Sequence, residues 1–192
     1  LPWLPAWEPE QGYLRIGDAP INLEAMVGYS YNEYRLIVPR DQTITAGDLL
    51  RTSDNDRQSA PARLDGTDLR IGSFNVLNYF NGNGSGGGFP TSRGASSAAE
   101  FERQRAKIIG ALRALDADVV GLMEIENDGH GAQSAIQDLV NGLNAAMGAG
   151  TYAVVPDPAN GTGSDEIKVA LIYKPAKLSR VGASLSDPAA IN

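Results

Sequence analysis

Two polar side chains lie in or directly after apolar segments of strand length, and both are of types that handle metal ions or phosphates. Asn75 lies in the run 69–78, and Glu124 lies near the end of the run 117–126. A carboxylate that follows an apolar strand must face solvent, form an ion pair or coordinate a cation, and its hard oxygens suit Mg²⁺ or Ca²⁺. An amide between apolar neighbours is either a structural hydrogen-bonding group or a ligand-facing one. The pair suggests metal-assisted chemistry on an anionic substrate, while a simple strand-end acid stays an open alternative for Glu124.

The segment between these two runs has helical periodicity, so the unit is predicted to be strand–helix–strand. We expect strands over 69–76 and 119–123. We also expect a helix that begins after Ser97, because Ser97 and Glu100 fit a capping box. Parallel strands joined by a helix present their carboxyl ends at one edge of the sheet, where open α/β sheets bind ligands. Both polar side chains would then lie at that edge.

The pattern along the whole chain predicts three regions. Residues 1–40 are expected to form short β structure with a tyrosine-rich hairpin that turns near 30–33, residues 41–67 a polar linker, and residues 68–192 an α/β domain. The further elements expected within that domain are a glycine-rich surface loop at 81–97, a helix over 133–147, and strands over 152–155 and 168–173. The predicted fold class is α/β in the broad sense that includes α+β.

Other polar residues near the two runs could contribute to a site. Glu126, Asn127 and Asp128 follow the second run closely and could add oxygen ligands, although an acidic turn that caps the next helix explains them equally well. Arg93, in the glycine-rich loop, could contact a phosphate or could simply be solvated, and the loop lacks the Gly-Lys-Ser/Thr end of a P-loop. His130 is the only histidine and lies in a glycine-flanked loop, so we predict a solvated side chain rather than a general base.

Composition limits the classes of function. Hydrophobic residues make up 42% and charged residues 20% of the 192 residues, as in ordinary globular proteins. The net charge of −7 argues against a surface that clamps nucleic acid everywhere, but a bound divalent cation can supply positive charge where a phosphate sits. The chain has no cysteine, which excludes disulfides and thiolate sites. No apolar run approaches the ~18 residues of a membrane-spanning helix, so we predict no membrane span.

An ordered series of motifs resembles one enzyme superfamily. The motifs, in chain order, are 74–80 (FNVLNYF), 89–95 (FPTSRGA), 100–108 (EFERQRAKI), 117–129 (ADVVGLMEIENDG) and 163–175 (GSDEIKVALIYKP). This series resembles the endonuclease/exonuclease/phosphatase superfamily, the fold of DNase I-like nucleases, and within it the bacterial secreted extracellular nucleases. The stretch 14–18 and the tyrosine-rich hairpin after it also resemble the end of the OB-like β module that precedes the nuclease domain in such proteins.

The resemblance implies a secreted, extracellular nuclease that hydrolyses phosphodiester bonds of DNA, or of RNA as well. It implies that Asn75 positions the scissile phosphate and that Glu124 binds a divalent metal ion. Mg²⁺ is the first choice for this ion, with Ca²⁺ and Mn²⁺ as alternatives. The candidates for substrate contact are Arg93 together with Asp165, Glu166 and Lys168, which precede or begin the last predicted strand.

The resemblance also implies what this sequence lacks. The family fold is a four-layer α/β sandwich of two β-sheets with helices outside, and residues 68–192 correspond to about its first half. The later Gly-Asp-Phe-Asn segment, the catalytic histidine and the terminal Ser-Asp-His motif do not occur in these residues. We therefore expect an incomplete part of a larger protein that is inactive alone. Its exposed sheet face would be covered by the remainder of its own polypeptide or by a partner chain.

Two other functions stay open from the sequence. The first is a phosphodiesterase or phosphatase that acts on lipid or nucleotide headgroups, since the superfamily core would be shared. The second is a non-catalytic binding or structural fragment of an extracellular assembly.

Overall fold

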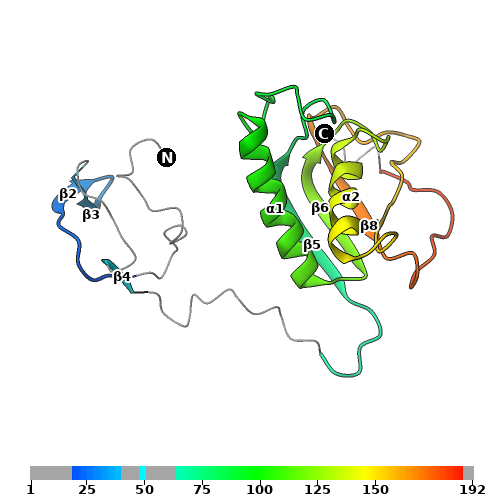
Figure 1. Cartoon of the computed structure of the whole chain (residues 1–192), viewed down its shortest axis with the longest axis horizontal. Coiled ribbons are helices and arrows are strands. Elements are labelled where there is room, and N and C mark those ends of the chain that lie inside the picture. The colour runs from blue at the N-terminus through cyan, green and yellow to red at the C-terminus, as the bar shows by residue number, and fades with distance from the viewer. Residues whose placement is uncertain (1–18, 40–47, 51–63, 188–192) are drawn as a thin grey trace. The chain divides into compact units, whose positions relative to one another are not determined.

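The computed structural model describes residues 19–39, 48–50 and 64–187. The chain divides into two compact units, residues 1–60 and 61–192 (Figure 1). The boundary between the units lies within the predicted linker. Part of that linker and the stretch 14–18, which resembles an OB-like module, lie outside the described residues.

The N-terminal unit contains the predicted tyrosine-rich hairpin. Strands β2 (Met26–Ser30) and β3 (Glu33–Ile37) pair antiparallel. The turn between them is formed by Tyr31 and Asn32, whose φ angles of 52° and 65° are left-handed. Two left-handed residues in a two-residue loop give a turn whose twist matches that of the flanking strands, and the predicted turn near residues 30–33 is confirmed. The other two strands of this unit, which also pair antiparallel, are β1 (Ala19–Pro20) and β4 (Leu49–Leu50).

The C-terminal unit combines a four-stranded sheet with two helices. Its elements in chain order are β5 (Ile71–Tyr79), α1 (Ala98–Leu115), β6 (Val119–Glu126), α2 (Ala135–Met147), β7 (Ala153–Val154) and β8 (Ile167–Tyr173). The strand order is β5-β6-β8-β7, with β5 parallel to β6 and β8 antiparallel to both β6 and β7. The predicted strand–helix–strand unit with parallel strands is confirmed, and the fold is a mixed α/β arrangement.

Both helices start at local hydrogen bonds that the sequence encodes. At the start of α1, Oγ of Ser97 accepts a hydrogen bond of 3.2 Å from the backbone N of Glu100, and Oε2 of Glu100 accepts one of 2.8 Å from the backbone N of Ser96. The predicted capping box is therefore present, with its reciprocal bond one residue earlier than usual. Helix α2 starts after Ser134, whose Oγ accepts from the backbone N of Gln137 at 3.4 Å.

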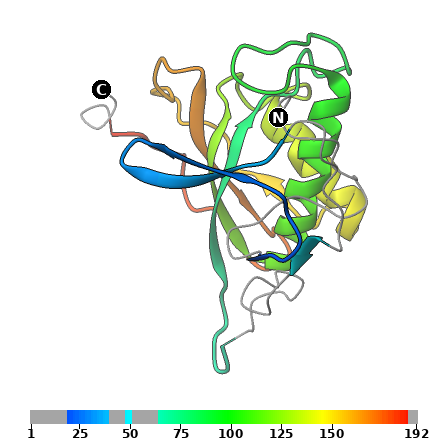
Figure 2. The ribbon, with the colours of Figure 1, turned by 90° about the vertical axis from the view of Figure 1, so that its left-hand side faces the viewer.

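The helices cover one face of the sheet and leave the other open. Figure 2 shows α1 and α2 on the same side of the strands. The fully buried side chains between the two layers include Val76, Val120, Leu122 and Ile172 from the sheet and Leu139 and Leu143 from α2. On the opposite face Ile71 is 72% and Val169 is 69% exposed. Apolar side chains gathered on one face of a sheet usually mark a surface that another layer covers, so the expectation of an uncovered apolar face is confirmed for the described residues.

Candidate functional site

Asn75 and Glu124 are in direct contact near the carboxyl ends of β5 and β6. The Nδ2 group of Asn75 donates a hydrogen bond of 2.7 Å to Oε1 of Glu124. The Oδ1 atom of Asn75 accepts a hydrogen bond of 2.8 Å from the backbone N of Leu77, so both ends of the amide are held. Asn75 is exposed and Glu124 is half-buried. The two side chains therefore lie at one edge of the sheet, as the sequence predicted, and the structure adds that they touch.

The contact depends on an irregularity in β6. The sequence predicted that Glu124 follows the strand, but this is wrong, because the strand continues beyond Glu124, which has a left-handed φ of 63°. Pairing with β8 changes register between Leu122 and Ile125, so β6 carries one extra residue there. In a regular strand Glu124 would lie on the same helix-covered face as Leu122. The bulge gives that buried place to Ile125 and leaves the carboxylate of Glu124 for Asn75.

A second irregularity lies opposite the first, in β5. Leu77 and Asn78 have left-handed φ angles of 54° and 51°, and pairing with β6 is interrupted between Asn75 and Tyr79. Regular alternation would bury Asn78 on the same face as Val76 and would expose Tyr79. The bulge instead lets Val76 and Tyr79 both be fully buried while Asn75 stays on the open face.

The acidic residues after the pair have separate roles. Oε2 of Glu126 accepts a hydrogen bond of 3.3 Å from the backbone N of Asn81. Burial raises the pKa of Glu126 to about 7, and the negative charges of Asp128 and Glu166 act in the same direction. Oδ2 of Asp128 accepts a hydrogen bond of 2.9 Å from the backbone N of Ala135, in the first turn of α2. Asp128 therefore takes the helix-capping role, one of the two that the sequence left open.

Arg93 forms ion pairs with the two acidic candidates that precede β8. Its Nη1 lies 2.8 Å from Oδ1 of Asp165, and its Nε lies 3.4 Å from Oε2 of Glu166. Asn127 holds the same segment, because its Nδ2 donates hydrogen bonds to the carbonyl oxygens of Asp165 (2.9 Å) and Gly163 (3.2 Å). Three of the predicted substrate-contact residues thus form one exposed cluster in which carboxylates match the charge of the arginine.

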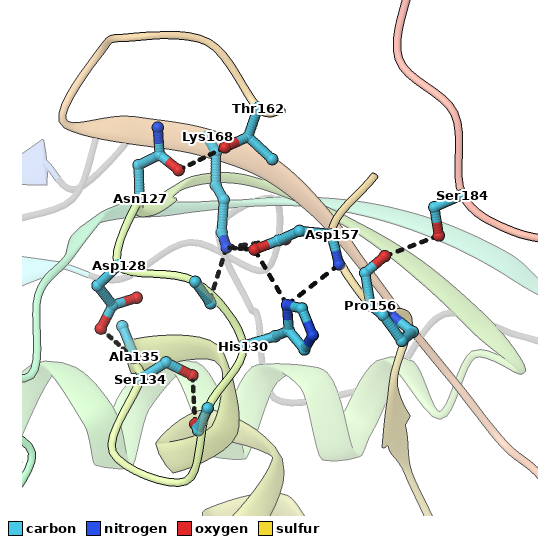
Figure 3. A network of polar contacts seen from close by, with 12 residues as sticks. Asn127, Asp128, His130, Ser134, Ala135, Pro156, Asp157, Thr162, Lys168 and Ser184 are labelled. Carbon is cyan, nitrogen blue, oxygen red and sulfur yellow. Dashed lines mark hydrogen bonds and ion pairs between the residues drawn. The ribbon is translucent and has the colours of Figure 1, made fainter. Parts of the chain in front are cut away.

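Lys168, the fourth of these candidates, is buried in a different network (Figure 3). Its Nζ donates to both carboxylate oxygens of Asp157, at 2.9 and 2.7 Å, and to the carbonyl oxygen of Gly129 at 2.7 Å. The side chain is 0% exposed, so the ammonium faces these partners and not the open face. Nδ1 of His130 lies 3.3 Å from both the backbone N and Oδ2 of Asp157. His130 keeps 45% of its side chain exposed, as expected of a solvated histidine, and it also packs against this network.

The site offers few protein ligands to a metal ion. Within residues 19–39, 48–50 and 64–187, no three His, Asp or Glu side chains are arranged to hold a metal ion. At the Asn75–Glu124 pair, one carboxylate oxygen of Glu124 has no hydrogen-bond partner among the described residues. Mg²⁺ is commonly bound through one or two carboxylates, with waters and substrate phosphates completing its shell. Glu124 can therefore offer one oxygen ligand to such a cation, and the described residues do not form a closed structural metal site.

Sequence reasoning missed Gln104 and Asp157. Gln104, on α1, donates hydrogen bonds to the carbonyl oxygens of Val76 and Leu77 in the bulge of β5. It stands among charged residues of the helix, where spacing gives no sign that its amide reaches another element. Asp157 lies between two prolines after a short strand, a place where an acid could have been singled out. Its partner Lys168 comes from β8 and could not be inferred from local pattern.

A cavity of about 620 Å³ lies elsewhere in the C-terminal unit. It lies between residues 155–158 and residues 180–186, and its walls include Val169 and Leu171 of β8. None of the predicted site residues lines this cavity. The Asn75–Glu124 pair therefore lies outside this cavity.

No protein-family model, no curated protein and no solved structure matches the chain. Among the described residues, no helix has both the length and the apolar character needed to cross a membrane. The site is therefore defined by its own geometry, in which an amide and a carboxylate meet at the open edge of a mixed α/β sheet.

Proposed function

We propose that the protein is a divalent-metal-dependent phosphodiester hydrolase with a DNase I-like fold, a nuclease acting on DNA, or on RNA as well. The observation that carries the proposal is the 2.7 Å hydrogen bond between Asn75 and Glu124 on adjacent parallel strands. It joins an exposed amide to a carboxylate that can accept a hard cation. The paired bulges also support the proposal, because bulges are over-represented next to active sites, where they re-aim side chains.

Each residue of the pair has a distinct role in this proposal. Glu124 would hold Mg²⁺, or alternatively Ca²⁺ or Mn²⁺, because one of its carboxylate oxygens is not bonded to Asn75. Such a cation would supply positive charge that polarises the phosphoryl oxygens and offsets the negative charge that develops during hydrolysis. The second N–H of the Asn75 amide donates to a phosphate oxygen and so places the phosphate beside the carboxylate. In the overall hydrolysis the water oxygen forms a new bond to phosphorus, the ester bond to the leaving oxygen breaks, and one proton of the water ends on that leaving oxygen.

Arg93 supplies substrate contact in the same proposal. Its side chain is 43% exposed and its ion-pair partners, Asp165 and Glu166, are more exposed still. Exposed ion pairs contribute little net stability, so exchange of a carboxylate for a phosphate has a small cost. Arginine also offers a planar set of donors that matches phosphate geometry.

The test is a supercoiled-plasmid cleavage assay on the full-length gene product with Mg²⁺, with EDTA in a parallel reaction. We expect Glu124→Gln to lower the cleavage rate by about 100-fold or more, because it removes the charge that holds the cation. Glu102→Gln is the matched control, since Glu102 is an exposed glutamate on α1 that lies 4.0 Å from Arg105. Cleavage by Glu124→Gln at the wild-type rate would refute the metal assignment. The same preparations incubated with a phospholipid substrate separate a nuclease from a headgroup phosphodiesterase.

A second candidate function is a non-catalytic binding or structural role for this chain. It is favoured by the position of His130, the only histidine, which packs on Asp157 and makes no contact with the Asn75–Glu124 pair among the described residues. In this case the metal and phosphate would bind without turnover. Cleavage that EDTA abolishes and that the 192-residue chain performs alone would exclude this role.

The proposal also includes the surroundings in which the protein acts. We propose an extracellular protein whose open sheet face is covered by further polypeptide, either its own or a partner's. The apolar side chains of Ile71 and Val169 on that face support a covering layer.

A further inference from the structure

Gln104 connects α1 to the edge of the sheet that carries the candidate site. Its Nε2 group donates two hydrogen bonds, one of 3.0 Å to the carbonyl oxygen of Val76 and one of 2.7 Å to the carbonyl oxygen of Leu77. Both acceptors belong to consecutive residues of β5. One side-chain amide on the helix therefore holds two successive backbone groups of the strand.

The two carbonyls belong to the part of β5 that departs from regular strand geometry. Leu77 and the following residue, Asn78, both have left-handed φ angles. Residues with a Cβ atom are disfavoured in this conformation, and two in succession are uncommon in a strand. Pairing with β6 is interrupted at the same place, so the regular register of the sheet does not hold the backbone there. Gln104 instead holds the two carbonyls from the side of the helix.

The same bulge sets the direction of the Asn75 amide. The backbone N of Leu77 donates to Oδ1 of Asn75 at 2.8 Å, which fixes which end of the amide is the oxygen. The Nδ2 group must then face the other way, toward Oε1 of Glu124. A change in the conformation of Leu77 would move the donor of the first bond and would therefore release the second.

We propose that Gln104 is a positioning residue for the Asn75–Glu124 pair. It holds the bulge of β5 in the conformation that directs the Asn75 amide to the carboxylate, although it touches neither side chain. That this positioning serves phosphate and metal chemistry rests on the function proposed above. The positioning itself is a statement about geometry and can be tested without any turnover.

The test uses the full 192-residue chain labelled with ¹⁵N and three variants. Gln104→Met keeps the length and helix preference of the side chain and removes both donors. Gln104→Lys keeps a donor that can reach the carbonyls. Gln137→Met is the matched control, because Gln137 is also a helical glutamine whose Nε2 donates a hydrogen bond, at 2.9 Å to Oδ1 of Asn141 in α2. Backbone spectra and circular dichroism first establish that each variant is folded.

Two measurements report on the pair without using activity. The first is NMR of the Asn75 side-chain amide, together with hydrogen exchange of the Leu77 amide proton. The second is a titration with Mn²⁺, which broadens the signals of nuclei near its site. We expect Gln104→Met to shift the Asn75 amide toward the position of a solvated amide and to speed exchange at Leu77. We also expect it to raise the Mn²⁺ concentration needed for broadening by about tenfold. Gln104→Lys should recover the Asn75 and Leu77 signals in large part, and Gln137→Met should leave them unchanged.

The outcomes separate the positioning role from the proposed function. Wild-type Asn75 and Leu77 signals in folded Gln104→Met would overturn the positioning role. If Gln104→Met does not fold, the Gln104→Lys variant decides the matter, because a retained donor with a displaced Asn75 amide also contradicts it. Absence of Mn²⁺ broadening around Glu124 in the wild-type chain counts against the proposed function and leaves the amide measurements to decide the role of Gln104.

Discussion

Replacing Asp118 by asparagine should destabilise the C-terminal unit in a pH-dependent way. The Asp118 side chain is 4% exposed and directly precedes β6. Its Oδ2 accepts hydrogen bonds from the backbone N of Arg70 at 2.9 Å and from Nζ of Lys177 at 2.7 Å, and Nζ of Lys174 lies 3.7 Å from Oδ1. These contacts tie the segment before β5 to the start of β6. They thereby help to hold the register that places Asn75 beside Glu124.

The size of the expected loss of stability depends on which contacts of Asp118 an asparagine side chain can keep. The amide oxygen of asparagine can still accept the hydrogen bond from the backbone N of Arg70. A neutral acceptor forms a weaker bond than an ionised one, and this difference costs about 1 kcal/mol of stability. The ion pair with Lys177 is lost as well, and because Lys177 is 43% exposed solvent screening limits this term to about 1 kcal/mol. We expect the free energy of unfolding at pH 7 to fall by about 2 kcal/mol. With a denaturant slope of about 2 kcal/mol per molar, the urea midpoint should fall by about 1 M.

The contribution of Asp118 to the free energy of unfolding depends on pH, because it requires the ionised carboxyl. Burial by itself opposes ionisation of Asp118, but the hydrogen bonds from Lys177 and from the backbone of Arg70 outweigh it and lower the pKa of the carboxyl below its usual range. A pKa that is lower in the folded state contributes stability that is complete above the unfolded value, about 4, and is lost as the pH falls through the folded value. The difference between wild type and Asp118→Asn should therefore shrink below about pH 4.

Urea denaturation followed by circular dichroism at pH 7 and pH 3 measures both effects. Asp68→Asn is the matched control, because Asp68 is exposed and makes no hydrogen bond or ion pair with the described residues. Its free energy of unfolding should change by less than about 0.5 kcal/mol. An Asp118→Asn difference that is equally large at both pH values would contradict the electrostatic reasoning, and a difference near zero at pH 7 would contradict the role of the hydrogen bonds.

Further predictions concern packing and a buried hydroxyl. A Cβ on Gly72 would lie 2.7 Å from Cδ2 of Leu115 and 3.2 Å from Cβ of Ala117, so Gly72→Ala should lower the free energy of unfolding by about 1–2 kcal/mol. Gly110 lies in α1 with open space at its Cβ position, so Gly110→Ala should raise the free energy of unfolding by about 0.5–1 kcal/mol. Thermal denaturation of both variants measures these two changes. Changes of the same sign in the two variants would refute the packing argument. Tyr79→Phe removes the 2.5 Å hydrogen bond from the fully buried Tyr79 to Oδ2 of Asp138 and should cost about 1–2 kcal/mol. Urea denaturation measures this loss of stability. Tyr173→Phe is the control, because the Tyr173 hydroxyl makes no hydrogen bond with the described residues. Equal losses of stability in the two variants would contradict the role of the Tyr79 hydrogen bond.

The elements that follow from neighbouring residues were predictable from the sequence. The capping residues Ser97 and Glu100 and the apolar periodicity after them marked α1, since both the cap bonds and the buried stripe arise within a few residues of each other. The tyrosine-rich hairpin and its turn followed from β-prone residues around a short polar link. Parallel pairing of β5 and β6 followed from the helix between them.

Partners that come from distant parts of the chain were not predictable in the same way. The sequence placed Lys168 among the substrate-contact candidates, but its ammonium is buried against Asp157. Arg93 was predicted either to reach a phosphate or to be solvated, and in the structure it pairs with Asp165 and Glu166. Each of these pairs joins two segments whose approach depends on how the whole unit packs.

The sequence by itself determined that Asn75 and Glu124 stand on neighbouring strands, because the apolar runs and the helix between them specify that arrangement. Only the tertiary structure decided that the two side chains touch. Regular alternation along β6 would place the Glu124 side chain on the face of the sheet that the helices cover. The bulge at Glu124 instead brings its carboxylate to the open face. The facing bulge in β5 is held by Gln104 from α1, and such a conformation depends on contacts across elements because it is locally unfavourable.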